Sequence, residues 1–214
     1  MRKTILVVGD SLTWGADPVT KRRHAPEFRW PNALQAGLGA QASVVTEALC
    51  GRTTSFDDNA VIEERNAARS MPMLLGSHQP LSLVILMLGT NDLKPHLCGL
   101  ATGAQAGMRR LVQMVRTHPY IDGDIPQVLI VAPAPRVETS SRPDVTQDAI
   151  EQSHLLAPLY QSLAKVENAW FFNAGIACSA SHADGVHLDA VQSQNLGTAL
   201  ARYLAPKIDK LSDY

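Results

Sequence analysis

Ser11, Asp184 and His187 are the residues of this chain whose types and spacing best suit nucleophilic catalysis. Ser11 follows Gly9 and Asp10 at the end of a short apolar run, and Asp184 stands three residues before His187. A serine hydroxyl becomes a good nucleophile when a histidine accepts its proton and a carboxylate orients that histidine. We therefore predict acyl-transfer chemistry, with Ser11 as nucleophile, His187 as general base and Asp184 as its orienting partner.

Two further loops carry groups that can stabilise the oxyanion formed in such a reaction. Asn91 offers a side-chain amide N–H, and Gly51 allows a backbone N–H to approach without an intervening side chain. Together with the backbone N–H of Ser11, these groups make up the predicted oxyanion hole. Four apolar residues beside the same motifs are predicted to line an acyl pocket: Leu12, Trp14, Leu93 and Val186.

Each of these features also has a simpler interpretation. Asp10 and Ser11 suit a helix N-cap or a phosphate-binding turn, because a helix start has free N–H groups that favour oxygen acceptors and negative charge. His187 is one of seven histidines, Asp184-Gly185 is a common turn dipeptide, and Asn91 is also a capping residue. The four predicted pocket residues can equally be ordinary packing.

Apolar runs that are typical of strands alternate with stretches of helical periodicity along the chain. This is the pattern of βαβ units, and it predicts an α/β fold, a three-layer sandwich around a five-stranded parallel sheet. The expected strands cover residues 5–8, 43–47, 81–88, 128–131 and 169–172, and the expected helices cover residues 31–39, 104–115, 148–166 and a segment after 189. Pro158 is expected to kink or divide the third of these helices.

Four long loops, at residues 15–30, 54–77, 93–103 and 134–147, show no pattern that determines their conformation. We expect them to build the walls of the pocket and any contacts between subunits. The basic run at residues 21–24 lies in the first loop. It is too short and isolated for a binding patch, so it predicts a solvated loop.

The composition suits a single globular domain that spans residues 1–214, with 45% hydrophobic and 18% charged residues. The net charge of −1 indicates neither nucleic acid nor an acidic membrane surface as a partner. No run reaches the about 20 apolar residues of a membrane span, and the N-terminal apolar run is shorter than the about 7–15 residues of a signal peptide. Cys50, Cys98 and Cys178 match no metal-binding pattern and predict free thiols and a cytoplasmic location.

Four sequence blocks occur in the order that defines a known family. They are Gly9-Asp10-Ser11-Leu12, Cys50-Gly51-Arg52-Thr53, Gly89-Thr90-Asn91-Asp92 and Asp184-Gly185-Val186-His187. With these blocks the chain resembles the SGNH hydrolases, also called GDSL-type esterases and lipases, and is most similar to their bacterial arylesterase and acyltransferase branch. The resemblance implies a parallel sheet in flavodoxin-like order, a small-molecule ester substrate, no metal or organic cofactor, and assembly into a homo-oligomer.

The activity that the resemblance implies is hydrolysis of small-acyl carboxylic esters, such as aryl or alkyl acetates, through an acyl-enzyme. Acyl transfer to alcohols is a further activity of that branch. A deacetylase of acylated sugars or a thioesterase would use the same catalytic residues. From a different class of protein, a non-catalytic flavodoxin-like module would bind an anion at the start of the helix that carries Ser11.

Overall fold

A parallel β-sheet of five strands lies at the centre of the protein in this computed structural model, which describes residues 2–121 and 124–212. The strands are β1 Lys3–Gly9, β2 Ala42–Ala48, β3 Leu83–Met87, β4 Gln127–Ala132 and β5 Trp170–Asn173. They are arranged in the order β2-β1-β3-β4-β5, and every neighbouring pair is parallel. This is the flavodoxin-like order, so the predicted sheet is confirmed.

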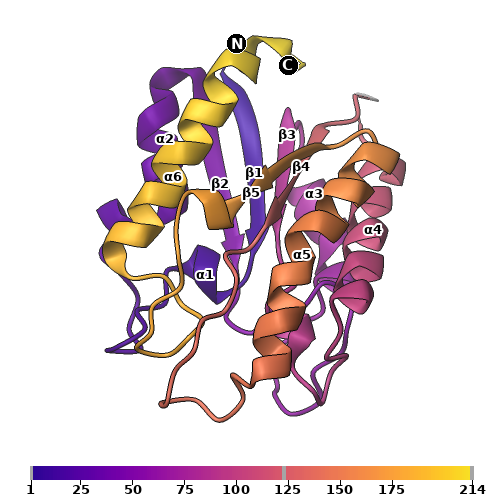
Figure 1. Ribbon diagram of the computed structural model, residues 1–214. Coiled ribbons are helices and arrows are strands. Elements are labelled where there is room, and N and C mark those ends of the chain that lie inside the picture. The colour runs from indigo at the N-terminus through magenta and orange to yellow at the C-terminus, as the bar shows by residue number, and fades with distance from the viewer. Residues whose placement is uncertain (1, 122–123, 213–214) are drawn as a thin grey trace.

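Helices cover both faces of the sheet and complete three layers (Figure 1). One face carries α2 Trp30–Leu38 and α6 Ala190–Leu204, and the other carries α3 Ala67–His78, α4 Ala101–Thr117 and α5 Gln147–Val166. The short helix α1 Ser11–Trp14 lies at the edge where the strands end. The predicted three-layer α/β sandwich is therefore confirmed.

The central strand β3 contributes side chains to two apolar layers. Val84 and Leu86 point into the layer shared with α3, α4 and α5, while Leu83, Ile85 and Met87 point into the layer shared with α2 and α6. All five side chains are buried. The uninterrupted apolar run that predicted this strand therefore reflects burial on both faces of a parallel sheet.

The helix α3 departs from the prediction that residues 54–77 form a loop. Asn66 caps its first turn through its side chain. Met71 and Leu75 follow at helical spacing and are buried in the core. Pro72 and the polar residues around it obscured this periodicity in the sequence. The helix tolerates the proline, whose ring lies on its exposed side.

The helix α5 is not divided at Pro158, so the expectation of a division is wrong. The helix runs without a break from Gln147 to Val166. A proline inside a helix removes the hydrogen bond to the carbonyl four residues earlier, here that of His154. Because Pro158 and His154 are both exposed, water can satisfy that carbonyl and the helix continues.

The first and third strands position the predicted chemistry. Gly9 of β1 lies beside Met87 of β3 in the parallel register. From β1 the chain crosses to β2 and from β3 to β4, in opposite directions along the sheet, so a crevice opens between these two strand ends. Ser11 begins α1 just after β1, and Asn91 begins a short helical turn, Asn91–Leu93, after β3.

Cys50, Cys98 and Cys178 are free thiols, as predicted. Burial raises the pKa of the Cys178 thiol to about 12, so this thiol is inert. In the described part of the chain, no helix combines the length and the apolar character that a membrane span requires.

Gly197 of α6 packs directly on α2, and we expect Gly197→Ala to destabilise the protein. A Cβ atom at position 197 would lie 2.3 Å from the carbonyl oxygen of Trp30 and 2.6 Å from Cβ of Ala33, so the two helices would have to separate. Overpacking of this kind costs about 1–3 kcal/mol, and a clash with backbone lies at the upper end of that range. Urea unfolding should show the lower free energy of unfolding.

The matched control is Gly76→Ala in α3, where the nearest atom to an added Cβ is 3.9 Å away. There the better helix propensity of alanine should stabilise the protein by up to about 1 kcal/mol. Equal free energies of unfolding for the two variants would contradict the close packing of α2 on α6.

Candidate active site

Ser11 stands on a tight turn between β1 and α1. Gly9 lets this turn close, because a Cβ atom at position 9 would lie 2.0 Å from Oγ1 of Thr13. Asp10 caps α1 by accepting a hydrogen bond from the backbone N–H of Leu12 (2.9 Å). Ser11 is the first residue of the helix, and it lines a cavity.

Asp184 and His187 lie on a tight turn before α6. Oδ1 of Asp184 accepts hydrogen bonds from the backbone N–H groups of Val186 (3.1 Å) and His187 (2.9 Å), which close the turn. Oδ2 of Asp184 is 2.6 Å from Nδ1 of His187, and Nε2 of His187 is 2.9 Å from Oγ of Ser11. The structure therefore brings the three predicted residues together in one chain of hydrogen bonds.

The partners of His187 define where its proton lies. An ionised Asp184 can only accept, so Nδ1 of His187 carries the proton, and Nε2 is left to accept from the hydroxyl of Ser11. This is the tautomer that can take the proton of the serine as its oxygen attacks a carbonyl.

Lys21 is a further partner of Asp184, and the sequence did not predict it. Its ammonium lies 3.0 Å from Oδ2 of Asp184, the same oxygen that His187 contacts. Burial alone would raise the pKa of Asp184, but the hydrogen bonds from His187 and Lys21 outweigh it and hold this pKa well below its usual range. The basic run at residues 21–24, interpreted as a solvated loop, thus contributes one residue to the site.

The three predicted oxyanion donors lie at the same cavity, which Ser11, Gly51 and Asn91 all line. Within the described residues, the backbone N–H groups of Ser11 and Gly51 donate to no protein acceptor, so a ligand can accept from them. The amide nitrogen of Asn91 donates to Oδ2 of Asp10 (3.3 Å) and to the carbonyl of Arg52 (3.1 Å). These two contacts orient the amide.

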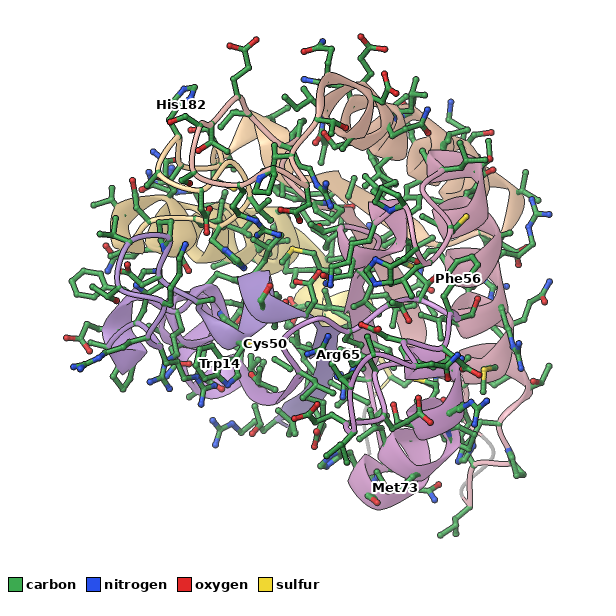
Figure 2. The ribbon with its side chains drawn as sticks, turned by 90° about the horizontal axis from the view of Figure 1, so that it is seen from below. Trp14, Cys50, Phe56, Arg65, Met73 and His182 are labelled. Carbon is green, nitrogen blue, oxygen red and sulfur yellow. The ribbon has the colours of Figure 1, made fainter. Side chains whose placement is uncertain are left out.

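Gly51 has a left-handed backbone conformation, with φ of +82°. The guanidinium of Arg65 lies directly against it, because a Cβ atom at position 51 would be 2.6 Å from the central carbon of that group. Figure 2 looks onto the carboxyl ends of the strands and shows Arg65 and Cys50 close to the middle of this edge. On the other side of Gly51, Arg52 donates to the carbonyl of Glu47 (2.6 Å).

Two buried carboxyl groups connect the segments that follow strands β1, β2 and β3. Asp92 accepts hydrogen bonds from the backbone N–H (3.1 Å) and the hydroxyl of Thr54, and so joins the loop after β3 to the loop after β2. Burial raises the pKa of Asp92 to about 6, against the opposing effect of these hydrogen bonds. Burial likewise raises the pKa of Asp10 to about 6, opposed by the hydrogen bond from Leu12.

A cavity of about 250 Å³ opens beside Ser11 and His187. All four long loops contribute to its walls, as expected; their lining residues are Ala16, Asp17, Lys21, Arg65, Lys94, Arg136 and Arg142. The volume is below the about 300–1,000 Å³ of sites for drug-sized ligands, so the cavity suits a small substrate. Among residues 2–121 and 124–212, no group of three or more His, Cys, Asp or Glu side chains is placed to hold a metal ion.

Among the four apolar residues predicted to line the pocket, Val186 does so. Leu12 and Leu93 are instead buried in the two core layers, and neither lines this cavity. Successive residues of a helix point about 100° apart, so the residue after Ser11 turns toward the core. Trp14 also lies outside the lining, and the guanidinium of Arg23 stacks on its ring at 5.0 Å from the centroid.

The sequence did not predict the charged residues of the cavity wall. Each of them lies in a loop without periodic pattern, and the four loops are far apart in the sequence. The sequence indicated these residues only through their location in the four long loops at residues 15–30, 54–77, 93–103 and 134–147.

The family of the chain is established by comparison with known proteins. A model of the GDSL-like Lipase/Acylhydrolase family matches residues 7–193, a range that includes Ser11, Gly51, Asn91, Asp184 and His187. The chain belongs to this family, and the predicted resemblance is confirmed.

Solved structures of similar proteins cover almost the whole chain. A carbohydrate acetylesterase family member from Sinorhizobium meliloti is 43% identical in sequence, with 97% of this chain and 99% of that chain covered and a TM-score of 0.94. The aryl esterase of M. smegmatis is 36% identical, with 95% of this chain and 99% of that chain covered and a TM-score of 0.89. These similarities and the family model place the chain among the carboxylic ester hydrolases.

A curated relative is longer than this chain. The acetylxylan esterase / glucomannan deacetylase of Cellvibrio japonicus is 25% identical over 231 aligned residues, which cover 100% of this chain. The chain spans 58% of the length of that relative.

The raised pKa of Asp92 predicts how stability depends on pH. The folded protein holds the proton of Asp92 more tightly than the unfolded chain does, because the pKa rises from 3.8 to about 6 on folding. The resulting stabilisation is fully present below about pH 4 and is lost as the pH rises through about 6; a shift of about 2 units corresponds to roughly 3 kcal/mol. Asp92→Asn removes this titration. In urea unfolding, the free energy of unfolding of the variant minus that of wild type should therefore increase as the pH rises from about 4 through about 6.

The control for this experiment is Asp209→Asn, which removes an exposed carboxylate far from the site. Its free energy of unfolding relative to wild type should change little with pH. If the Asp92→Asn and Asp209→Asn proteins followed the same pH dependence, the assignment of the titration to Asp92 would be wrong.

Proposed function

We propose that the protein is a serine esterase that hydrolyses esters of small carboxylic acids, with Ser11 as nucleophile. The observation that carries this proposal is the hydrogen-bond chain from Oγ of Ser11 through His187 to Asp184, with distances of 2.9 Å and 2.6 Å, at the wall of a small cavity. The backbone N–H groups of Ser11 and Gly51 and the amide of Asn91 are the proposed oxyanion donors.

In the proposed reaction, Oγ of Ser11 attacks the carbonyl carbon of the ester while its proton passes to Nε2 of His187. The carbonyl oxygen becomes an oxyanion, and the donors named above stabilise it. The tetrahedral intermediate then expels the alcohol, which takes the proton from His187, and leaves an acyl group on Ser11. Water, deprotonated by His187, then attacks this acyl-enzyme. The bond between the acyl carbon and Oγ of Ser11 breaks, His187 returns the proton to Oγ, and the carboxylic acid is released. An alcohol in place of water would accept the acyl group instead, which is the proposed transferase activity.

The size of the cavity favours acetate and other short acyl groups over long chains. Aryl and alkyl acetates are the proposed substrates. The names of the carbohydrate acetylesterase and deacetylase relatives support acetylated sugars as a second candidate class. Rates with aryl acetates, acetylated sugars and acyl thioesters, measured side by side, would separate these classes, since all of them use the same catalytic residues.

The decisive experiment is the intact mass of wild type and Ser11→Ala after treatment with a fluorophosphonate. We expect one adduct on wild type and none on the variant, because only an activated serine reacts with this reagent. In steady-state assays with an aryl acetate, kcat of Ser11→Ala should fall on the order of 10⁶-fold if the three residues act as a unit.

The opposite result would favour a different class of protein. A folded wild-type chain that forms no adduct and hydrolyses no ester would not be a serine esterase. Tight binding of phosphate or flavin by the same preparation would then support the non-catalytic module that holds an anion at the start of α1.

Asn91 should be needed for turnover more than for binding. We expect Asn91→Ala to lower kcat by about 10²–10³ with a smaller change in KM, the range observed for loss of one oxyanion donor. Asn195→Ala, at an exposed position of α6, is the control and should keep the wild-type kcat. An Asn91→Ala enzyme with unchanged kcat would exclude the amide from the oxyanion hole.

A further inference from the structure

The cavity beside Ser11 is lined by an excess of cations. Its charged lining consists of one carboxylate, Asp17, besides the imidazole of His187, and five cationic side chains: Lys21, Arg65, Lys94, Arg136 and Arg142. The whole chain has a net charge of −1, so this concentration of positive charge is local and does not follow from composition. Every one of the four long loops contributes at least one of these cations.

Three of the five cations are paired with carboxylates of the protein. Arg65 lies 2.9 Å from Oδ2 of Asp58, and Lys21 lies 3.0 Å from Oδ2 of Asp184. Arg142 pairs with Asp144, which it contacts through two of its nitrogens. These pairs account for the charge of three side chains and leave Lys94 and Arg136.

Arg136 is buried and forms no ion pair with the residues that the structure describes. It is 3% exposed, and its guanidinium donates to the carbonyls of Thr90 (2.8 Å) and, more weakly, Asp144 (3.5 Å). Its Nε has no hydrogen-bond acceptor among the described residues. Burial lowers the pKa of Arg136, and the negative charges of Asp144 and Asp10 only partly oppose this effect.

Lys94 is half-buried and forms no hydrogen bond or ion pair within the described part of the chain. Burial and the neighbouring charges of Arg65 and Arg142 lower its pKa, and Asp58, already paired with Arg65, only partly opposes them. Lys94 therefore lies among like charges with no acceptor of its own.

The remaining carboxylates near the cavity, those of Asp17 and Asp10, already accept hydrogen bonds from other groups of the protein. Asp17 accepts hydrogen bonds from the backbone N–H groups of Val19 (2.8 Å) and Thr20 (2.7 Å). Asp10 accepts from Leu12 and Asn91 beneath the site. Because an unpaired buried charge is unfavourable, an anion in the cavity would gain strongly from contacts with Lys94 and Arg136.

Arg52 shows what a purely structural arginine looks like in this fold. It is also buried, but it holds the Gly51 loop through the carbonyls of Glu47 and Gly9, and it does not line the cavity. Arg136, in contrast, lines the cavity, although its unpartnered Nε is buried, as is that of Arg52.

Building on the proposed esterase function, we propose that the substrate is a small ester that also carries a carboxylate, which Lys94 and Arg136 bind while Ser11 attacks the ester group. The cavity of about 250 Å³ has room for a small acid ester and no more. The chemistry at Ser11 is unchanged, and the carboxylate takes no part in bond making; its contacts hold the ester in place and select it over neutral esters.

Two matched pairs of esters test this proposal, one for each side of the ester bond. For the alcohol side the probes are para-acetoxybenzoate and para-acetoxybenzamide, and for the acyl side they are monophenyl succinate and phenyl succinamate. Members of a pair have nearly the same shape and differ in charge. Each kcat/KM is divided by the rate of hydroxide-catalysed hydrolysis of the same ester, which removes the difference in intrinsic reactivity.

In at least one pair, we expect the normalised kcat/KM of the carboxylate ester to exceed that of the amide by about tenfold or more, as for a hydrogen bond to a charged group. Lys94→Met and Arg136→Gln should each reduce this preference by about tenfold. Lys165→Met, which removes the same charge from an exposed position of α5, should leave it unchanged. Added salt should weaken the preference in wild type.

The outcomes separate this proposal from the one on which it rests. If charged and neutral esters were hydrolysed equally well in both pairs, the enzyme would be an esterase without carboxylate recognition. A preference that survived in both Lys94→Met and Arg136→Gln would overturn the assignment to these residues. If none of the four esters were hydrolysed and the fluorophosphonate formed no adduct, the esterase function itself would fail.

Discussion

The close approach of the carboxyl ends of β1 and β3 is the constraint on which the site depends. Their parallel register keeps the residues that follow Gly9 and Met87 within reach of one another. Asp10 converts this proximity into a fixed geometry, since one of its oxygens accepts from Leu12 and the other from Asn91. One buried side chain thus orients both the helix that carries Ser11 and the proposed oxyanion amide. Burial raises the pKa of Asp10 because it disfavours the charged form, and the hydrogen bond from Leu12 only partly opposes this effect.

Local patterns predicted the sheet and the proximity of the proposed triad, because strands alternate with helices and a short turn carries Asp184 and His187 together. The same reasoning failed where a side chain's direction depends on tertiary packing. Leu12 adjoins Ser11 in sequence, yet the rotation of one helical residue directs it into the core. The cavity wall was beyond prediction, since Arg65 and Arg136 reach it from irregular loops. Such loops depend on individual contacts, some of them with residues distant in sequence, such as that of Arg136 with Thr90.

The electrostatics of the proposed triad are shared with the cavity wall. Oδ2 of Asp184 accepts from both His187 and Lys21, so the carboxylate that orients the imidazole also holds the loop at residues 15–30 against the site. The hydrogen bonds from His187, and to a lesser extent the one from Lys21, keep Asp184 ionised, as the lowered pKa of Asp184 shows. A single oxygen atom thus contacts both the imidazole of His187 and the loop that carries Lys21.

We expect the four long loops to determine substrate choice, because they supply the charged wall of the cavity. Relatives that share the fold almost residue for residue are named for carbohydrate acetates in one case and aryl esters in another. In this chain each of the four loops brings at least one cation to the cavity, and the protein neutralises three of the five with its own carboxylates. Arg136 is buried beside these cations, and within the described residues it contacts backbone carbonyls and no carboxylate. Burial of a charge without an ionic partner lowers stability. Under the proposed function, an anionic ester would bring that partner into the cavity when it binds beside Ser11.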